Sequence, residues 1–508
     1  MVQLDPTKIQ VQSNAAPAWE QEESFQDMMA ERLRQAPWLI LSAALHAVLL
    51  LLVWALFPPE APKKPKLKAE MKIKEEKQIE EPPPPPPPET KVEEVTEEVV
   101  VTETTVTEQE EALDNSETED TSKESAFDSN QWNSAVGLGG GAGGRYGGRG
   151  GGRGGKGGKS YAAAIDAGLK WLANHQDEDG KWDCDGFMKH DSADSEICNG
   201  PGNAVHDVGV TGLALLAFLG DGSTMRSGPY KKNIKKGVLW LKGQQQENGL
   251  FGSNASHDFI YDHAIAAYAM CEAYGLSEYK LLRKTAQNGL NYLESHRNPY
   301  SVWRYQPRDN DNDISVTGWA IMAYESGEFF ELKVNTGALK LCETFLDQVS
   351  DPTGKHGYTK QGEGSSRKPG EHGTKFPIEK GEALTAVGLF CRFFMNQDPK
   401  EKPVMKAAAN LLRSKPPVWD EKSGSIDHYY WYYATYALFQ YGGSHWTDWQ
   451  KKLETAVVKN QHRDKGKKNL IGSWDPIGAW GEDGGRVYST AILTLTLEAY
   501  YRYSRLVR

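Results

Sequence analysis

A short sequence phrase occurs twice in this chain, and it limits the folds that the chain can adopt. The first copy runs Gly168-Leu169-Lys170-Trp171-Leu172, then Gln176, then Gly180-Lys181-Trp182. The second follows 69 residues later as Gly237-Val238-Leu239-Trp240-Leu241, Gln245 and Gly249-Leu250-Phe251. Each copy indicates an amphipathic helix that ends at a Gln, a glycine turn and an aromatic side chain. Recurrence of this kind indicates a repeat architecture whose units bury each other's apolar faces.

Apolar residues recur with helical spacing in six pairs of segments between Tyr161 and Tyr503. The second member of each pair is richer in small and apolar residues, as in 211–218, and a helix that is apolar nearly all round is buried. We therefore predict an all-α toroid of six helical hairpins over residues 160–508, with six inner helices and six outer ones. The first members are expected near 161–175, 230–246, 281–296, 335–349, 403–414 and 446–461. Their partners are expected near 206–219, 262–275, 313–326, 381–396, 427–441 and 486–503.

The repeated phrases resemble the QW-type repeats of the squalene cyclase and protein prenyltransferase superfamily. The closing segments resemble bacterial prenyltransferase/squalene oxidase repeat proteins, many of them from planctomycetes. These segments are Gly472-Ser473-Trp474, Gly484-Gly485-Arg486-Val487-Tyr488-Ser489-Thr490 and Leu497-Glu498-Ala499-Tyr500-Tyr501-Arg502-Tyr503. The resemblance implies the α/α toroid and leaves the activity open. On this interpretation the Gln, Gly and Trp of the phrase are structural, and functional residues belong to the inner helices.

A second constraint comes from Trp38–Phe57, a run of 20 residues whose only polar members are Ser42 and His46. At about 1.5 Å per residue such a helix spans a bilayer core of about 30 Å. Pro58-Pro59-Glu60 follows without a small-x-small cleavage site, which argues against a removed signal peptide. We predict a tail at 1–36 and one transmembrane helix at 37–58 that anchors the chain in the inner membrane.

Ser42 and His46 stand four residues apart, so they share one face of the predicted helix. With the Lys/Pro-rich stretch and Pro82–Pro88 that follow, this segment resembles the N-terminus of TonB-type energy transducers. In that family the Ser-x-x-x-His face docks on an ExbB/ExbD-type proton-driven motor. The resemblance implies motor coupling through Ser42 and His46 and a periplasmic C-terminal domain. The lysines after the span favour the opposite orientation, and a histidine tolerated by its neighbours is the alternative.

Residues 59–159 consist of a Lys/Pro/Glu block, a Thr/Glu/Val block and a Gly/Arg/Lys block. None of these compositions can form a core, so we predict a disordered linker. Residues 137–159 contain 15 glycines with Arg145, Arg149, Arg153, Lys156 and Lys159. Such a composition can bind nucleic acid. Only one aromatic residue is interleaved and the chain is predicted to be tethered to a membrane, so we expect no nucleic-acid partner.

The inner helices of a toroid begin at one end, where their first residues converge on a central cavity. Asp207, Asp262 and Asp313 each stand four residues before a small residue of an inner helix, and Glu382 falls within one residue of the same register. These four are the candidate catalytic acids. The alternative is that they stabilise helix N-termini, which is worth about 0.3–1 kcal/mol.

His206, His263 and His428 adjoin Asp207, Asp262 and Asp427 at the same helix starts. Histidines and carboxylates that converge could bind zinc or act as general acid and base. Adjacent helical residues point about 100° apart, so each doublet offers one member to a shared centre. Trp431, Trp480 and Tyr488 could line a pocket for an apolar or isoprenoid ligand, or form core. The sequence requires no cofactor, and the metal is left open.

Known chemistries of the superfamily do not transfer directly. Asp309-Asn310-Asp311-Asn312-Asp313 is the closest match to the Asp-x-Asp-Asp acid motif of class II terpene cyclases, and it lacks the adjacent pair. The Asp-x-Cys of zinc-dependent prenyltransferases is absent from the sequence. We predict a membrane-anchored toroid that binds a ligand or partner. The alternatives are a cyclase-like or prenyltransferase-like enzyme with Asp313 or Asp262 as its acid, and a carbohydrate-active toroid.

Five cysteines leave the compartment open. Cys184 and Cys198 lie in one predicted loop and could pair in an oxidising environment, while Cys271, Cys342 and Cys391 are expected to be buried thiols.

Overall fold

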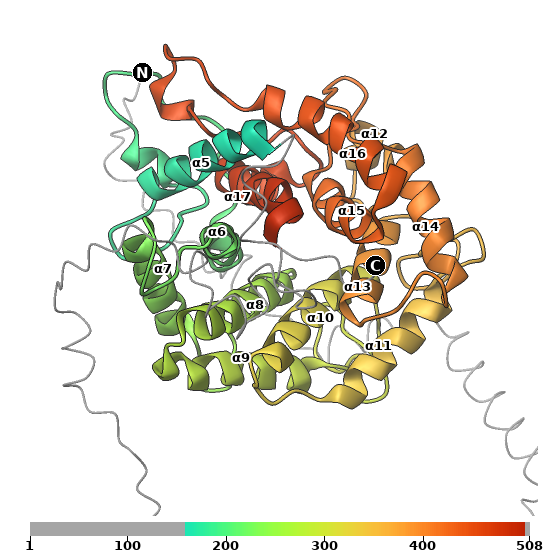
Figure 1. The fold of residues 1–508 in the computed structure, drawn as a ribbon. Coiled ribbons are helices and arrows are strands. Elements are labelled where there is room, and N and C mark those ends of the chain that lie inside the picture. The colour runs from blue at the N-terminus through green and yellow to red at the C-terminus, as the bar shows by residue number, and fades with distance from the viewer. Residues whose placement is uncertain (1–157, 503–508) are drawn as a thin grey trace, which may run out of the picture. The chain divides into compact units, whose positions relative to one another are not determined.

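The computed structural model describes residues 158–502 (Figure 1). The predicted transmembrane segment with Ser42 and His46 and the linker through residue 157 lie outside the described residues, and these predictions remain untested. Between residues 158 and 502 the chain forms 13 α-helices and no β-strand. The described part is therefore all-α, as predicted.

Six helices form an inner ring, and each contacts the next around it (Figure 1). They are α6 (Asp207–Asp221), α8 (Phe259–Ser277), α10 (Ile314–Phe329), α13 (Ala383–Phe394), α15 (His428–Tyr441) and α17 (Gly481–Arg502). The ring closes because α17 packs against α6. Six outer helices surround it: α5 (Gly158–Asn174), α7 (Lys231–Gln244), α9 (Arg283–His296), α11 (Thr336–Val349), α14 (Pro403–Ser414) and α16 (Gly443–Ala456). The short α12 (His372–Lys375) lies in the connection between α11 and α13. The predicted six-hairpin α/α toroid is confirmed.

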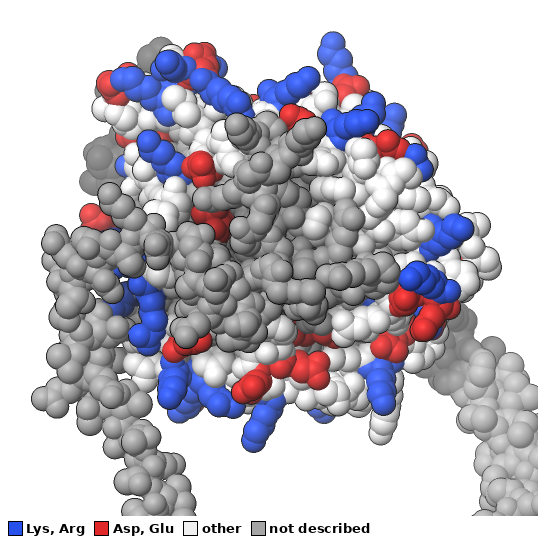
Figure 2. Space-filling view, in the orientation of Figure 1, with Lys and Arg blue, Asp and Glu red and all other residues white. Residues whose placement is uncertain are grey.

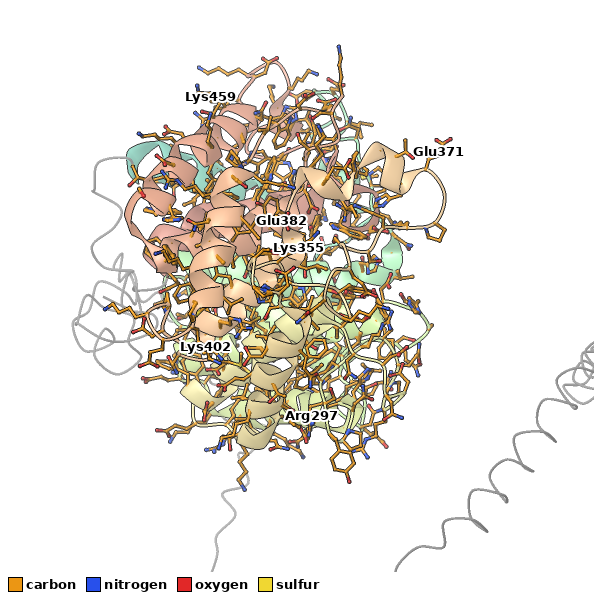
Figure 3. The ribbon with its side chains drawn as sticks, turned by 90° about the vertical axis from the view of Figure 1, so that its right-hand side faces the viewer. Arg297, Lys355, Glu371, Glu382, Lys402 and Lys459 are labelled. Atoms are coloured by element: carbon orange, nitrogen blue, oxygen red, sulfur yellow. The ribbon has the colours of Figure 1, made fainter. Side chains whose placement is uncertain are left out.

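The pairing of the helices differs from the sequence expectation in one respect. Each outer helix packs chiefly against the inner helix that precedes it in the chain, and α5 packs on α17. Connections of 1–9 residues follow the inner helices, whereas connections of 13–33 residues lead into them. A short connection brings two helices together as antiparallel neighbours. The long connections gather at the end where the inner helices begin, and Figure 3 shows Glu371 of one long connection and Lys402 of a short one on opposite sides.

The inner helices are buried on all sides because they are built from small and apolar residues. In α6 every residue from Val208 to Gly220 is buried. Gly212 permits close packing on α8, since a Cβ there would lie 3.0 Å from Ile265 Cγ2. Among the described residues, 204–221 is the one helical segment long and apolar enough to cross a membrane, and 72% of it is buried in the fold. It is a core helix of the toroid.

The glutamine of the repeated phrase joins neighbouring outer helices. Gln176 Nε2 donates to Gly180 O of its own turn and to Asn233 O of α7 at 2.8 and 2.9 Å. Gln245 makes the same bonds to Gly249 O and to Thr285 O of α9. Gln461 repeats them with Gly472 O at 2.9 Å and Ala164 O of α5 at 2.7 Å. We call these two hydrogen bonds the Gln461 clasp, and they join the last turn of the ring to its first helix.

The aromatic residue of the phrase plugs the space between the layers. Trp182 is buried, its Nε1 donates to Leu172 O at 2.7 Å, and its backbone N–H donates to Thr211 Oγ1 of α6 at 3.0 Å. Trp303 and Trp474 make equivalent bonds to the outer helix and to an inner-helix threonine. The phrase therefore holds the two layers together, and the function has to be sought elsewhere.

Charged side chains are distributed over the periphery. Figure 2 shows acidic and basic groups interspersed around the visible rim. The five cysteines are all buried and free. Cys184 Sγ lies 3.2 Å from Gly484 O and Cys198 Sγ lies 3.2 Å from Asn469 O, so the two thiols face different partners and are unpaired.

Candidate functional site

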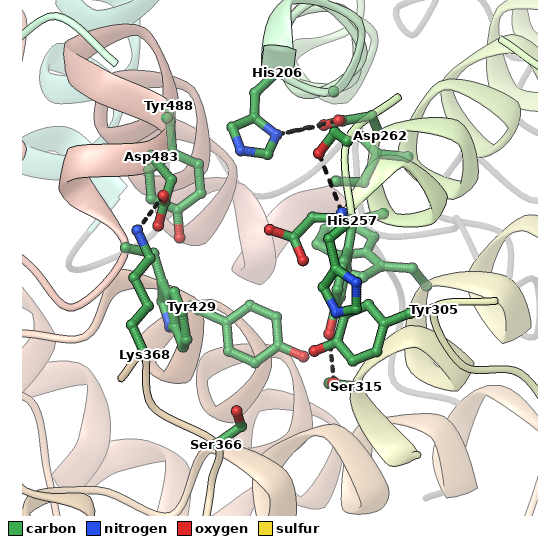
Figure 4. Close-up of a pocket in the computed structure, with 18 of the residues that line it drawn as sticks. His206, His257, Asp262, Tyr305, Ser315, Ser366, Lys368, Tyr429, Asp483 and Tyr488 are labelled. Atoms are coloured by element: carbon green, nitrogen blue, oxygen red, sulfur yellow. Dashed lines mark hydrogen bonds and ion pairs between the residues drawn. The ribbon is translucent and has the colours of Figure 1, made fainter. Parts of the chain in front are cut away.

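A cavity of about 680 Å³ lies where the inner helices begin. All six inner helices contribute to its wall, together with residues of the long connections (Figure 4). Its floor includes Val210, Leu213, Ile265 and Trp319, which stand one turn or more inside their helices. Its upper wall carries hydroxyl, imidazole, carboxylate and guanidinium groups. The cavity is therefore apolar at its base and polar at its mouth.

His206 and Asp262 form a pair at the edge of this cavity. His206 Nδ1 lies 3.1 and 3.2 Å from the two carboxylate oxygens of Asp262, and the side chains face each other in Figure 4. Burial lowers the pKa of His206, but the hydrogen bond and charge of Asp262 outweigh this effect, so the net shift is upward. The pair can be this close because Gly209, three residues after His206, leaves room for the Asp262 carboxylate, with which a Cβ at this position would collide. A histidine held by a carboxylate is suited to general acid–base chemistry.

Asp313 lies behind the cavity wall. It caps α10, where its Oδ1 accepts from Val316 N at 2.8 Å and from Ser315 Oγ at 2.9 Å. Burial raises the pKa of this fully buried carboxyl to about 6. Ser315 Oγ lies 2.6 Å from Tyr261 OH, and Tyr358 OH donates to Asp313 Oδ2 at 3.4 Å. Ser315, Tyr261 and Tyr358 line the cavity, so hydroxyl groups connect the carboxyl to it.

The connection between α11 and α13 supplies one side of the mouth through Ser365–Pro369. It is fixed to the first turn of α17 and to Ala479 just before that helix. Lys368 pairs with Asp483, His372 Nε2 donates to Ala479 O at 2.6 Å, and Lys375 pairs with Glu482 at 2.9 Å. We call residues 365–375 the strap, and these three contacts hold it at the mouth.

Formal charges on the cavity wall are balanced. Of the wall residues in the described part of the chain, Arg304, Arg367 and Lys368 are basic, and Asp258, Asp262 and Asp483 are acidic. The Arg367 guanidinium lies 3.5 Å from Asp427 and 5.8 Å from the centre of the Trp480 ring. The wall presents aromatic rings and paired charges, without an excess of either sign.

The structure brings four of the predicted site residues to the cavity: His206, Asp262, Trp480 and Tyr488. Two of the three predicted His–Asp doublets divide as the 100° helical rotation requires, and neither Asp427 nor His428 lines the cavity. At 262–263, Asp262 faces the cavity while His263 accepts from Phe251 N and donates to Gly289 O on the outer side. His263 is therefore a structural clasp.

The other predicted site residues lie away from the cavity. Asp207 accepts from Lys181 Nζ at 2.7 Å and from Cys184 N at 2.9 Å, which fixes the loop before α6. Glu382 pairs with Lys415 at 3.3 Å. His428 and Trp431 are buried against each other outside the cavity wall, and the His428 ring also stacks on Trp419 of the connection before α15. His206, His263 and His428 do not converge, so they do not form a common zinc site.

Several cavity residues were not singled out from the sequence. Tyr261 was within reach, since it stands beside Asp262 at the start of an inner helix. Arg304, Tyr358 and Ser366 come from long connections without periodicity, and only the folding of those connections over the mouth places them on the wall.

No protein-family model matches this chain, and no curated protein matches it. Solved structures match at the level of the fold. An inactive variant of the α-1,6-mannanase GH76A of Salegentibacter sp. HEL1_6 in complex with α-1,6-mannotetrose is 10% identical, with a TM-score of 0.47 over 67% of this chain and 98% of that chain. The type II terpene cyclase MstE from Scytonema is 12% identical, with a TM-score of 0.43 over 67% and 97%. Cellobiose 2-epimerase from Bacillus thermoamylovorans B4167 is 13% identical, with a TM-score of 0.45 over 67% and 98%.

Proposed function

We propose that the toroid binds a neutral carbohydrate in its cavity and that His206 and Asp262 act on it as an acid–base pair. The observation that carries the proposal is the hydrogen-bonded His206–Asp262 pair at the edge of a cavity with balanced charge. A sugar presents C–H faces that pack on aromatic rings and hydroxyl groups that need hydrogen-bond partners. Tyr305, Tyr429 and Trp480 offer the rings.

The geometry gives His206 a defined role. Asp262 engages Nδ1, so Nε2 is the nitrogen that remains for a ligand. Because Asp262 raises its pKa, the imidazole is a stronger base than a free histidine side chain, which suits removal of a proton from a sugar and its return. Asp262 orients the ring and stabilises the imidazolium that forms. The balanced wall favours an uncharged substrate over a phosphorylated or acidic one.

The test uses the full-length protein in detergent and a panel of neutral oligosaccharides, with binding followed by calorimetry and turnover by mass spectrometry. Trp480→Ala is expected to weaken binding at least tenfold, because a stacking ring is lost. Tyr300→Ala is the matched control, since this aromatic residue is 91% exposed and lies outside the cavity wall. His206→Gln is expected to retain binding and lose turnover. Equal affinities of the Trp480 and Tyr300 variants, or no sugar binding at all, would refute the proposal.

A second candidate function is acid catalysis on an apolar substrate. It is favoured by Asp313, a buried carboxyl with its pKa raised to about 6, and by the apolar floor of the cavity. A carboxyl that is protonated near neutral pH can donate a proton within an apolar site. In this case native mass spectrometry of the full-length protein, purified from its host, reveals an isoprenoid lipid in place of a sugar. Asp313→Asn, which keeps a cap at α10, then abolishes conversion without releasing the lipid.

We further propose that residues 37–58 anchor the toroid in the inner membrane, with the toroid in the periplasm, and that Ser42 and His46 contact an ExbB/ExbD-type motor. The support is the apolar run Trp38–Phe57 and its Ser-x-x-x-His face. His46→Ala is expected to abolish co-purification of ExbB/ExbD-type proteins. Val48→Ala, about 200° away on the same helix, is the control. Retained co-purification in the His46 variant argues against the coupling, and a C-terminal reporter fusion tests the orientation.

A further inference from the structure

His175, Asp191 and Cys198 meet at the outer side of the toroid, away from the cavity wall. His175 follows the last residue of α5, and the other two lie in the connection from α5 to α6. One ligand atom from each of the three lies within 4.8 Å of the other two. All three side chains are almost fully buried, with His175 4% and Cys198 4% exposed and the Asp191 side chain 3% exposed.

The hydrogen bonds around His175 fix which nitrogen faces Asp191 without a proton. Nδ1 lies 2.8 Å from the carbonyl oxygen of Trp171, which can only accept, so Nδ1 carries the proton. Nε2 then directs its lone pair at Asp191 Oδ1, 3.1 Å away, and a carboxylate oxygen is also an acceptor. In the neutral imidazole two acceptors therefore face each other at a buried site, and a cation between them removes the conflict.

The remaining contacts orient the other two side chains. Asp191 Oδ2 accepts from Cys198 N at 2.5 Å, which leaves Oδ1 directed toward His175. Cys198 Sγ lies 3.2 Å from Asn469 O. In metal sites a backbone carbonyl commonly holds the far nitrogen of a histidine ligand, and hydrogen bonds hold the carboxylate ligand. Trp171 O and Cys198 N are in the positions that these supporting roles require.

A nearby group of acids provides a contrast. Asp183, Asp185 and Asp207 also lie close together, but Lys181 and Lys189 already place their ammonium groups among them. Asp191 has no such partner, because within residues 158–502 His175 is the one ionisable side chain paired with it. Nearby Arg486 and His190 are paired with Asp475 and Asp177. Within the described residues, no neighbouring side chain therefore places a positive charge beside His175, Asp191 and Cys198.

We propose that His175, Asp191 and Cys198 bind one zinc ion. The donor set of imidazole nitrogen, carboxylate oxygen and thiolate sulfur suits zinc and disfavours magnesium and calcium. Zinc bonds of about 2.0–2.2 Å to nitrogen and oxygen at a tetrahedral angle place these atoms about 3.3 Å apart, close to the observed 3.1 Å. Because thiolate is the form that binds zinc, zinc binding releases the proton of the Cys198 thiol to solvent.

The ion would fasten the 32-residue connection between α5 and α6 to the end of α5. That connection ends at His206, which forms the edge of the cavity. The site is thus independent of the chemistry in the cavity and acts on the segment that carries His206 there. Because the three ligands come together only in the folded chain, binding energy adds to folding stability.

The test uses full-length protein in detergent, stripped of metal with a chelator and dialysed, then titrated with Zn²⁺ or with Co²⁺ as a spectroscopic probe. We expect one Zn²⁺ per chain, an increase in the temperature of unfolding, and with Co²⁺ the absorption of a tetrahedral ion with a thiolate-to-metal charge-transfer band. Cys198→Ser should lose the charge-transfer band and bind zinc at least tenfold more weakly. Cys184→Ser is the matched control, since this thiol is in the same connection but outside the site.

Three results would overturn the proposal: stoichiometric zinc in the Cys198→Ser variant, loss of the cobalt charge-transfer band in Cys184→Ser alone, or less than a tenth of an equivalent of zinc in the wild-type protein. If Cys198→Ser does not fold, as judged by helical circular dichroism, the cobalt spectrum of the wild-type protein decides, because it shows whether a thiolate is a ligand. His175→Gln then tests the imidazole ligand by the same spectrum.

Discussion

The Gln461 clasp offers a stringent test of how the ring is held closed. Replacing Gln461 by Met keeps the volume and flexibility of the side chain and removes its amide group. Two buried hydrogen bonds are lost, to Ala164 O and Gly472 O. Ala164 also belongs to α5, where its carbonyl accepts a helical hydrogen bond, so it is not fully deprived of partners. We therefore expect about 1 kcal/mol for each bond, near the lower end of the cost of a buried group left unpaired.

The total of about 2 kcal/mol corresponds to a roughly 30-fold change in the folding equilibrium. The measurement is urea denaturation of the full-length protein in detergent, followed by tryptophan fluorescence. Gln287→Met is the control, because the Gln287 amide also makes hydrogen bonds, to Asn291 Oδ1, Lys333 O and Lys333 N, but all of them are exposed to solvent. Exposed bonds exchange with water, so this variant should change the free energy of unfolding by less than about 0.5 kcal/mol. Equal effects of the two substitutions would refute the reasoning.

Three further results are expected. Gly209→Ala should weaken ligand binding, measured by calorimetry, because the added Cβ collides with the Asp262 carboxylate. Gly243→Ala has open space around the added methyl and should stabilise the protein by about 0.5–1 kcal/mol, measured by urea denaturation. Because the pKa of His206 is raised in the folded state, its pairing with Asp262 stabilises the fold fully below pH 6.5. This stabilisation is lost as pH rises through the folded-state pKa. Wild-type protein and His206→Gln should therefore differ more in unfolding free energy at pH 5.5 than at pH 9. The pKa of Asp313 is raised from 3.8 to about 6, so the wild type should lose up to about 3 kcal/mol of stability as pH rises from 3.8 to 6. A loss of the same size in Asp313→Asn would show that another group causes it.

The toroid could be predicted from the sequence because helical periodicity is a local signal and the inner segments are apolar all round. The glutamine of the repeated phrase recurs because it bridges its turn to the next outer helix, and the tryptophan recurs because it joins its outer helix to an inner one. The preference of each outer helix for the preceding inner helix follows from connection lengths that are visible in the sequence once the helix bounds are known.

Only the site residues at the starts of inner helices could be predicted from the sequence. His206 immediately precedes α6 and Asp262 stands in the first turn of α8, and the convergence of these helices brings the two side chains together. Their neighbours Asp207 and His263 point away because adjacent residues on a helix point about 100° apart. The sequence predicts that one residue of each pair faces the cavity, but not which one. The residues of the strap could not be predicted, because their position depends on ion pairs with Asp483 and Glu482, more than 100 residues later in the chain.

The closure of the ring has a mechanical consequence. An open solenoid can lose its terminal repeats one by one, but every hairpin of a closed toroid has two neighbours. One junction lacks covalent continuity, and it is the place where α5 rests on α17 and Gln461 grips α5. A pulling force that reaches the toroid from the N-terminal side is applied first to α5. The helix that receives such a force first is therefore also the helix that closes the ring.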